Sequence, residues 1–248
     1  MKLLEKTAII TGCARGIGQA TARLFCKEGA SLVINDLTDE IFTLEKELLD
    51  AGCNVVAVKG SIADYETVEK IVNTALEKFG KIDILINTVA LPHRKSIMET
   101  PIEEFDRIIS TNTKAIYYPC KAVIPHMIER KYGRIVNISS VAGIRGGGLL
   151  GKSTYACSKG AVTSLTKGIA REVAQYGITC NVVCPGFVKT PRNDVETPEA
   201  VERVIKQIPL GRGGLAEDVA PTLLHLASDD AAFITGTVSV VDGGTTMV

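Results

Sequence analysis

Residues 1–248 are predicted to form one α/β domain in which helices cover both faces of a seven-stranded parallel sheet. Three observations predict this fold class. Short runs rich in β-branched residues recur along the chain, longer stretches of helical periodicity separate them, and no linker, repeat or low-complexity segment interrupts the alternation. Strands that alternate with helices in this way lie parallel, and right-handed crossovers place the helices on both faces.

The predicted strands are mainly apolar, which is typical of strands buried on both faces of a sheet. They cover residues 6–11, 31–36, 54–59, 82–87, 134–139, 178–183 and 237–242. Between them, residues 64–79 show helical periodicity, and Thr100-Pro101-Ile102-Glu103 predicts a helix start with a capping box and proline at the first helical position. Such a chain forms a doubly wound (Rossmann) fold, whose ligands bind outside the carboxyl ends of the strands.

The charge balance and composition restrict the partners. Lys plus Arg and Asp plus Glu both total 28, and the chain has no Trp and few other aromatic residues. Nucleic-acid binding needs a cationic surplus and aromatic platforms for the bases, so we expect no nucleic-acid partner. The chain runs from its first residues into a strand and has no apolar stretch of membrane-spanning length, so we expect a cytoplasmic protein without membrane association.

The seven cysteines are scattered along the chain and include no C-x-x-C pair. An odd number of cysteines within apolar runs predicts reduced, buried thiols, as in most cytosolic proteins. Cys180 and Cys184 lie close in sequence, but no third ligand is near them, so we expect no metal site.

The segment Thr11-Gly12-Cys13-Ala14-Arg15-Gly16-Ile17-Gly18 joins the first strand to a helical stretch at 19–28 and indicates a phosphate site. Gly12 permits a tight turn, Gly16 lets the backbone approach a pyrophosphate, and Gly18 lets the helix pack close to the strand. The phosphates would face the positive end of the helix. A glycine-rich turn without a ligand is the alternative, but the position between the first strand and a helix favours a dinucleotide.

Asp36, at the end of the second predicted strand, indicates NAD rather than NADP. A carboxylate there accepts hydrogen bonds from the adenosine ribose hydroxyls and repels a 2′-phosphate. Arg15 favours the opposite preference, because a guanidinium in the glycine-rich loop pairs with a 2′-phosphate. We give Asp36 more weight, since a buried like-charge clash costs more than an arginine at the rim contributes. Capping of the following helix is the alternative role of Asp36.

Tyr155 and Lys159 are four residues apart in a helical segment, so their side chains share one face. Reduction of a carbonyl needs a proton donor at oxygen while hydride arrives at carbon, and a tyrosine serves when its pKa falls toward the working pH. Lys159 would lower that pKa by favouring phenolate. Ser140, just past the fifth strand, is placed to hydrogen-bond the substrate oxygen.

A second pair with the same spacing, Tyr117 and Lys121, lies deep in the helical stretch after Thr100. Pro119 stands between its members, and no serine at a strand end precedes it. Tyr155 instead follows the fifth strand, Ser140 and a glycine-rich loop. Position therefore favours Tyr155 and Lys159 as the catalytic pair.

Five motifs occur in a fixed order: TGCARGIG, Asn112, NISS, YACSK and CPGFVKT. Together they resemble the short-chain dehydrogenase/reductase family, in its compact branch and near its ketoacyl reductases. The resemblance covers essentially the whole chain, down to the DGGTTMV tail. It supports a single dinucleotide-binding catalytic domain over residues 1–248.

The resemblance implies a role for each matching residue. Tyr155 would be the general acid/base and Ser140 would polarise the substrate oxygen. Lys159 would bind the nicotinamide ribose, and Asn112 would hold a water in a proton relay. The cofactor contacts that we predict are Gly12, Arg15, Gly16, Ile17, Gly18, Asp36, Ser61, Ile62, Asn87, Tyr155, Lys159, Pro185, Gly186, Val188 and Thr190. Family members are usually homotetramers, assembled partly through two long helices that correspond here to about residues 112–131 and 153–176.

The chain departs from the family pattern at three places. Asn87-Thr88-Val89-Ala90 stands where N-N-A-G is usual, so Ala90 must adopt a conformation that glycine usually supplies. Ser61-Ile62 replaces Asp-Val after the third strand, which removes an acidic partner of the adenine amino group. Acyl-carrier-protein reductases usually carry two basic docking residues, and the corresponding positions are Lys131 and Tyr176, of which only one is basic.

The loops after the fourth, fifth and sixth strands are expected to form the substrate wall. They carry His93-Arg94-Lys95, Arg145 with Leu149-Leu150, and Phe187 with Arg192-Asn193. We predict substrate contacts at Arg145, Leu150, Phe187 and Arg192, with an anionic substrate group on one or two of the basic residues. The alternative is that these are solvated loop charges, and we expect His93 to be a surface residue without function. Thr197-Pro198-Glu199 predicts a short helix, either a lid or an ordinary connection.

The sequence therefore predicts an NAD(H)-dependent oxidoreductase that transfers a hydride between the nicotinamide and a secondary alcohol or ketone. The alternative is a 3-oxoacyl thioester reductase, acting on an acyl-carrier protein or coenzyme A substrate with NADPH, which Asp36 and Tyr176 disfavour. A remote alternative is a non-catalytic dinucleotide-binding protein, which only the altered N-N-A-G segment favours.

Overall fold

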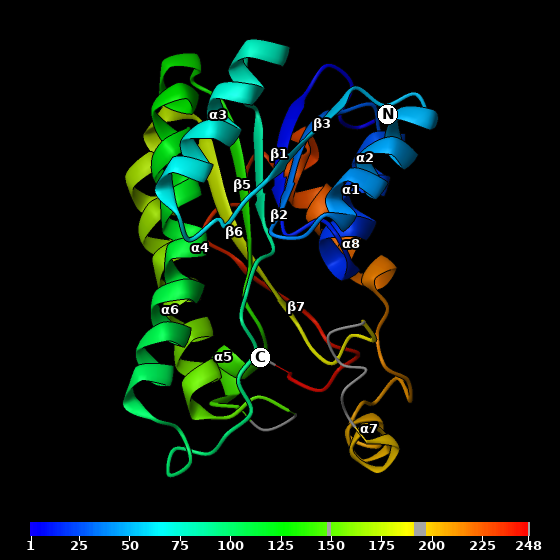
Figure 1. Cartoon of the computed structure of the whole chain (residues 1–248), viewed down its shortest axis with the longest axis vertical. Helices are drawn as coiled ribbons and strands as arrows, with labels where there is room; N and C mark the ends of the chain where they lie inside the picture. The colour runs from blue at the N-terminus through cyan, green and yellow to red at the C-terminus, as the bar shows by residue number, and fades with distance from the viewer. Residues whose placement is uncertain (148–149, 191–196, 248) are drawn as a thin grey trace.

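The computed structural model describes residues 1–147, 150–190 and 197–247 (Figure 1). Seven parallel strands form one sheet in the order β3-β2-β1-β4-β5-β6-β7. The strands are β1 (Thr7–Thr11), β2 (Ser31–Asp36), β3 (Val55–Lys59), β4 (Ile84–Asn87), β5 (Gly133–Ile138), β6 (Ile178–Pro185) and β7 (Val238–Val241). Each begins and ends within two residues of its predicted bounds, so the predicted fold class is confirmed.

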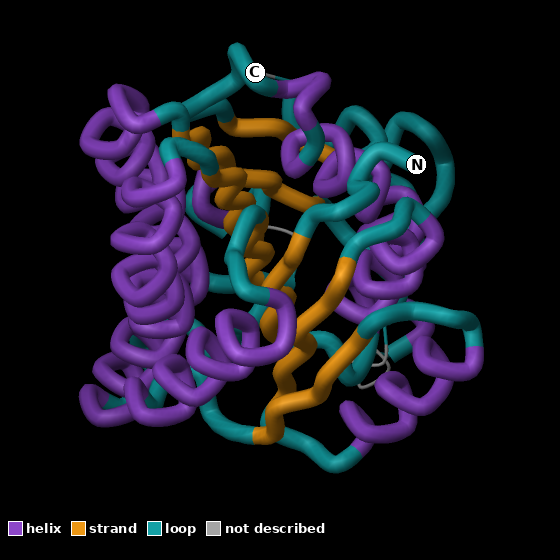
Figure 2. Tube along the Cα trace, turned by 90° about the horizontal axis from the view of Figure 1, so that it is seen from above, coloured by secondary structure: helices purple, strands orange, loops and turns teal. Residues whose placement is uncertain are grey.

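Helices cover both faces of the sheet, as the view from above shows (Figure 2). One side carries α1 (Gly16–Lys27), α2 (Glu40–Asp50) and α8 (Ala216–Ala227), and the other carries α3 (Tyr65–Phe79), α4 (Ile102–Arg130) and α6 (Ser153–Val173). The shorter helices are α5 (Ala142–Arg145) and α7 (Pro198–Ile205), with 3₁₀ turns at η1 (Ala174–Tyr176) and η3 (Asp229–Ala231). An apolar core fills each of the two interfaces between sheet and helices.

The strand order reverses between β1 and β4, which are neighbours in the sheet but distant in sequence. The loops that leave these two strands part toward opposite faces, so a crevice opens outside their carboxyl ends. In Figure 1 this edge of the sheet lies at the bottom, where α5 and α7 are drawn. The architecture therefore places a ligand site beside the loops that follow β1, β4, β5 and β6.

The start of α4 corrects one local prediction. The helix begins at Ile102, but Pro101 is its N-cap residue and no side chain caps it. The Thr100 hydroxyl donates instead to the Ser96 carbonyl oxygen at 2.7 Å, so the predicted capping box is wrong. Threonine hydroxyls often bond to a backbone carbonyl in the preceding turn, and such a bond takes the place of helix capping here.

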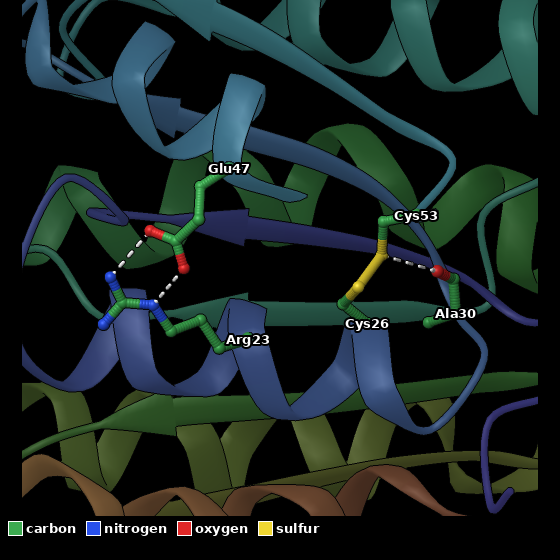
Figure 3. Close-up of a disulfide and its surroundings, with 5 residues drawn as sticks. All are labelled: Arg23, Cys26, Ala30, Glu47 and Cys53. Carbon is green, nitrogen blue, oxygen red and sulfur yellow. Dashed lines mark hydrogen bonds and ion pairs between the residues drawn. A yellow bond between two sulfur atoms is a disulfide. The ribbon is translucent and has the colours of Figure 1, made fainter. Parts of the chain in front are cut away.

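The cysteines correct a second prediction. Cys26 of α1 and Cys53, just before β3, form a disulfide, so the expectation of seven reduced thiols is wrong (Figure 3). Cys157 is exposed, and the other four cysteines are buried free thiols. Burial raises the pKa of the Cys120 thiol to about 12. Nearby, Arg23 of α1 and Glu47 of α2 are joined by two hydrogen bonds at 2.7 and 2.8 Å (Figure 3).

Thiol alkylation of the folded protein is expected to modify Cys157 alone, because a buried thiol with a raised pKa supplies neither access nor thiolate. Unfolding without reductant should expose all five free thiols, and reduction should raise the number of labels to seven. Intact-mass measurement counts the labels. Seven labels without reductant would show that Cys26 and Cys53 are not bonded.

No helix in the three described ranges is long and apolar enough to cross a membrane. Within the same ranges, no group of three or more His, Cys, Asp or Glu side chains is arranged to hold a metal ion.

Candidate active site

A cavity of about 150 Å³, open to solvent, lies outside the carboxyl ends of the strands. Its walls come from the loops that follow β4, β5 and β6, from α6 and from the start of α1. The side chains and backbone that line it include Ile17, His93, Arg94, Ser140, Leu150, Tyr155, Gly186, Phe187, Val188 and Thr190. The predicted catalytic, cofactor and substrate loops therefore meet at one place.

Tyr155 and Ser140 both line this cavity. Lys159 lies one turn after Tyr155 on α6, is buried, and donates from Nζ to the Ile138 carbonyl oxygen at 2.9 Å. The Ser139 hydroxyl donates to the backbone oxygen of Lys159 at 2.7 Å. These bonds attach α6 to the end of β5, so the fold sets the position of the tyrosine relative to the serine.

Asn112 is buried in the middle of α4 and joins two parts of the site. Its Oδ1 accepts from the Leu91 backbone N–H at 2.6 Å, and its Nδ2 donates to the Leu91 carbonyl at 3.1 Å and to the Ser158 hydroxyl at 2.9 Å. The Ser158 hydroxyl in turn donates to the backbone oxygen of Tyr155 at 2.8 Å. The side chain thus connects the loop after β4 to the turn of α6 that carries the tyrosine. Its role in a proton relay stays a prediction.

The glycine-rich loop has the shape that a dinucleotide needs. Gly12 has a φ of +73°, a conformation that side chains disfavour, and an added Cβ there would lie 2.7 Å from the Thr88 hydroxyl. A Cβ on Gly18 would overlap the carbonyl oxygen of Gly12. The helix α1 begins at Gly16, so its first backbone N–H groups face the cavity side of the loop. The residues present therefore fit the pyrophosphate of a nicotinamide dinucleotide.

Asp36 lies beside this loop at the end of β2. Its Oδ2 accepts from the Ala14 backbone N–H at 3.0 Å, and its Oδ1 accepts from the Leu37 N–H at 2.7 Å and the Thr38 N–H at 3.2 Å. The following helix α2 starts at Glu40 with Asp39 as its N-cap, so Asp36 does not cap it. The carboxylate is held against the glycine-rich loop, where an adenosine ribose would lie.

The altered N-N-A-G segment is accommodated without strain. The Thr88 hydroxyl donates to the Thr11 carbonyl at 2.6 Å and lies 3.2 Å from the Gly12 carbonyl, which fastens the end of β4 to the glycine-rich loop. Asn87 donates to the Asn137 side chain at 2.9 Å across the sheet. Among the described non-glycine residues, only Glu5 and Lys131 have a positive φ. The expectation that Ala90 must adopt a glycine-like conformation is therefore wrong.

The segment after β3 places its two residues in different environments. Ile62 is buried in the core between the sheet and α3, and Ser61 is exposed. Asp64 caps α3 by accepting from the Glu66 backbone N–H at 3.3 Å. Of the two predicted cofactor contacts here, Ser61 is the one whose side chain reaches the surface.

The predicted substrate residues separate into three groups. Leu150 and Phe187 line the cavity, and Phe187 packs with Val204 and Ile208 in an apolar cluster. Arg145 is exposed at the end of α5 and is not among the residues that line the cavity. Residues 149, 192 and 193, which include the predicted contact Arg192, lie outside the described residues.

The structure places His93 and Arg94 in the cavity wall, which corrects the expectation that His93 is a surface residue. The His93 side chain is only 2% exposed. The sequence gives no signal for this, because His93 lies six residues after the end of β4 and the side chains around it come from other segments.

The second Tyr-x-x-x-Lys pair lies outside the site. Tyr117 is 46% exposed on α4, and neither Tyr117 nor Lys121 lines the cavity. The Lys121 ammonium lies 6.0 Å from the Tyr117 ring centroid, a loose surface contact. This pair supplies a matched control for the proposed catalytic tyrosine.

Gly18→Ala is expected to lower the stability of the protein by about 1–3 kcal/mol and to weaken NADH binding at least tenfold, because the added methyl group meets the backbone of Gly12. Thermal unfolding and titration of NADH fluorescence measure the two effects. Gly168→Ala is the matched control, since an added Cβ at Gly168 in α6 meets nothing within 4 Å. Equal NADH affinities of the Gly18→Ala and wild-type proteins would contradict the loop assignment.

Comparison with known proteins agrees with this geometry. The family model described as enoyl-(acyl carrier protein) reductase matches residues 12–246. The chain is 41% identical over 254 residues to oxidoreductase UcpA of Salmonella typhimurium, covering 99% of this chain and 96% of that protein. It is 37% identical over 245 residues to the 3-oxoacyl-[acyl-carrier-protein] reductase FabG of Thermotoga maritima, covering 98% and 99%. The FabG reductase of Staphylococcus aureus is 34% identical over 243 residues, covering 97% and 98%.

Proposed function

The chain belongs to the short-chain dehydrogenase/reductase family of oxidoreductases, and we propose that it transfers a hydride between NAD(H) and a secondary alcohol or ketone. Family membership confirms the resemblance seen in the motifs, the oxidoreductase class and the binding of a nicotinamide dinucleotide. The observation that carries the finer proposal is that Tyr155, Ser140 and the strand-end residues Gly186 and Val188 line one cavity.

We assign the chemistry to Tyr155, Ser140, Lys159 and Asn112. When bound, the nicotinamide supplies or accepts the hydride. Tyr155 gives a proton to the carbonyl oxygen during reduction and takes it back during oxidation, as a general acid/base. Ser140 hydrogen-bonds the same oxygen and holds it toward the tyrosine. Lys159 binds the nicotinamide ribose from α6, where its ammonium lies beside the end of β5, and Asn112 holds the loop after β4 against α6.

The preference for NAD rests on the charges around Asp36. Its carboxylate accepts hydrogen bonds from the ribose hydroxyls, whereas a 2′-phosphate at the same place would be repelled by the negative charge. The neighbouring surface hollow is lined by Asp39 and Glu40 with Lys59, so acidic groups outnumber basic ones. Arg15 favours NADP instead, because it places a positive charge in the same region. Hydrogen bonds from Thr38 and the backbone lower the pKa of Glu40, and the charge of Arg15 lowers it further.

Helix α7 covers the apolar side of the cavity. It begins as predicted, because the Thr197 hydroxyl accepts from the Ala200 backbone N–H at 3.2 Å and Pro198 opens the first turn. Val204 of this helix packs on Phe187, which lines the cavity. We assign α7 the role of a lid that excludes water during hydride transfer.

Assembly and domain organisation are part of the same proposal. Residues 1–248 act as one catalytic domain, and four copies associate through α4 and α6. Phe105 and Tyr117 support this, because both aromatic side chains are at least 40% exposed on α4. The molar mass in solution, measured by light scattering, tests the tetramer.

A second candidate is reduction of a 3-oxoacyl thioester with NADPH. It is favoured by the relatives named as 3-oxoacyl-[acyl-carrier-protein] reductases. Asp36 disfavours this candidate. So do the two positions that would bind an acyl-carrier protein: Lys131 at the end of α4 lies beside the turn that carries Tyr176, and only the lysine is basic.

A substrate screen that follows NADH and NADPH absorbance in both directions tests the proposal. We expect turnover of secondary alcohols or ketones with NAD(H), at a higher kcat/KM than with NADP(H). Turnover restricted to 3-oxoacyl thioesters with NADPH would establish the second candidate. Binding of NADH without turnover of any alcohol, ketone or thioester would indicate a non-catalytic protein.

A further inference from the structure

His93 combines burial, a polar group without a partner and a place in the cavity wall. The residue is 4% exposed and lines the same cavity as Ser140 and Tyr155. Its Nδ1 atom is buried and has no hydrogen-bond partner in the described part of the chain. A buried polar atom without a partner is costly, and one at a ligand site is usually satisfied by the ligand.

The other ring nitrogen fixes the tautomer. The Thr100 hydroxyl lies 3.4 Å from His93 Nε2, but its own proton is donated to the Ser96 carbonyl at 2.7 Å. The Thr100 oxygen therefore accepts, and Nε2 must be the nitrogen that carries the proton. Glu104 Oε1, at 3.8 Å from Nε2, favours the same arrangement. With the donor hydrogen on Nε2, Nδ1 is the acceptor nitrogen of the ring.

The acidic group beside the ring already has a cationic partner. The Glu104 carboxylate is already paired with the Lys95 ammonium at 2.5 Å, which also lowers the pKa of Glu104. Arg94, the next residue, lines the same cavity. A neutral acceptor at Nδ1 selects a hydroxyl donor over a carboxylate, which offers only acceptors.

We propose that His93 is a substrate-binding residue that accepts a hydrogen bond from a second hydroxyl group, so the substrate is a diol or a hydroxyketone rather than a simple mono-alcohol. This inference rests on the proposed alcohol or ketone chemistry at Tyr155 and Ser140. Leu150 and Phe187 supply the apolar part of the wall for the carbon skeleton.

The test compares cyclohexanol with vicinal cyclohexanediol, and sec-butanol with vicinal butanediol, so that each pair differs by one hydroxyl. His93→Phe removes the acceptor at nearly constant size, whereas His93→Asn keeps an acceptor oxygen at the position of Nδ1. We expect the wild-type protein to prefer each diol, and His93→Phe to lower the ratio of kcat/KM for diol over mono-alcohol on the order of 10- to 100-fold. His93→Asn should retain most of the preference.

His225→Phe is the matched control, because the same change is made at an exposed histidine on α8. Thermal unfolding verifies that each variant is folded. The inference is overturned if the wild-type protein has no diol preference, or if His93→Phe lowers both members of a pair equally. An increase in activity toward hydroxy acids, with diols unaffected, overturns it as well.

Binding measured without turnover separates this inference from the proposed function. With NADH bound to the Tyr155→Phe protein, nicotinamide fluorescence reports the dissociation constants of hydroxyketone and ketone probes. Adding His93→Phe should lower the ratio of the ketone dissociation constant to the hydroxyketone dissociation constant. The factor should match the fall in the kcat/KM ratio measured in turnover. If Tyr155→Phe retains full activity, the proposed chemistry fails while the binding result still decides the role of His93.

Discussion

Tyr155→Phe is expected to reduce kcat on the order of 10²- to 10⁴-fold while leaving the fold and NADH binding intact. The substitution removes one hydroxyl group and keeps the ring that lines the cavity. Without that hydroxyl, the developing alkoxide receives no proton, whereas Ser140 and Lys159 keep their places because both are fixed by bonds to backbone atoms. Steady-state kinetics with the best ketone from the screen, together with NADH fluorescence titration, measures the two parts of the prediction.

Tyr117→Phe is the control for this prediction. It makes the same chemical change in the second Tyr-x-x-x-Lys pair, at a residue that is 46% exposed and does not line the cavity. Its kcat should stay within about twofold of the wild-type value, because the change removes one hydroxyl group outside the cavity and keeps the ring. A loss of activity in Tyr117→Phe with none in Tyr155→Phe would reverse the assignment of the catalytic pair.

The elements and the outline of the site were predictable from sequence because both depend on local patterns. Buried parallel strands are apolar along most of their length, so β1 to β7 stand out between helices of regular period. The strand ends then fix which loops meet at one edge. For the same reason the loop after β5 and the start of α6 bring Ser140 and Tyr155 to one cavity.

Most of the errors concern features that distant residues decide. The capping box is the exception, because the Thr100 hydroxyl donates to the Ser96 carbonyl oxygen, only four residues earlier in the chain. Cys26 and Cys53 meet only after α1 and α2 pack on the sheet. Nothing in the loop sequence shows that His93 turns inward while Arg145 turns outward, since their neighbours in space come from other segments.

Asp36 carries the second large prediction, which concerns the choice of cofactor. Asp36→Asn keeps an oxygen that accepts from the Leu37 and Thr38 N–H groups but removes the negative charge. We expect the ratio of dissociation constants, Kd(NADPH) over Kd(NADH), to fall on the order of 100-fold. The reason is that the repulsion between the carboxylate and the 2′-phosphate disappears. NADH binding itself should weaken several-fold, since the amide no longer serves both the Ala14 N–H and a ribose hydroxyl.

Asp39→Asn separates the local contact from the general charge of this surface. It removes one negative charge nearby, but Asp39 is 77% exposed and already paired with Lys59 at 2.7 Å, so solvent and the lysine screen it. The ratio of the two dissociation constants should then change by less than about threefold. Equal changes in Asp36→Asn and Asp39→Asn would mean that net surface charge, rather than a carboxylate at the ribose, sets the preference. A wild-type protein that binds NADPH more tightly than NADH would instead make Arg15 the deciding residue, as its place in the glycine-rich loop allows.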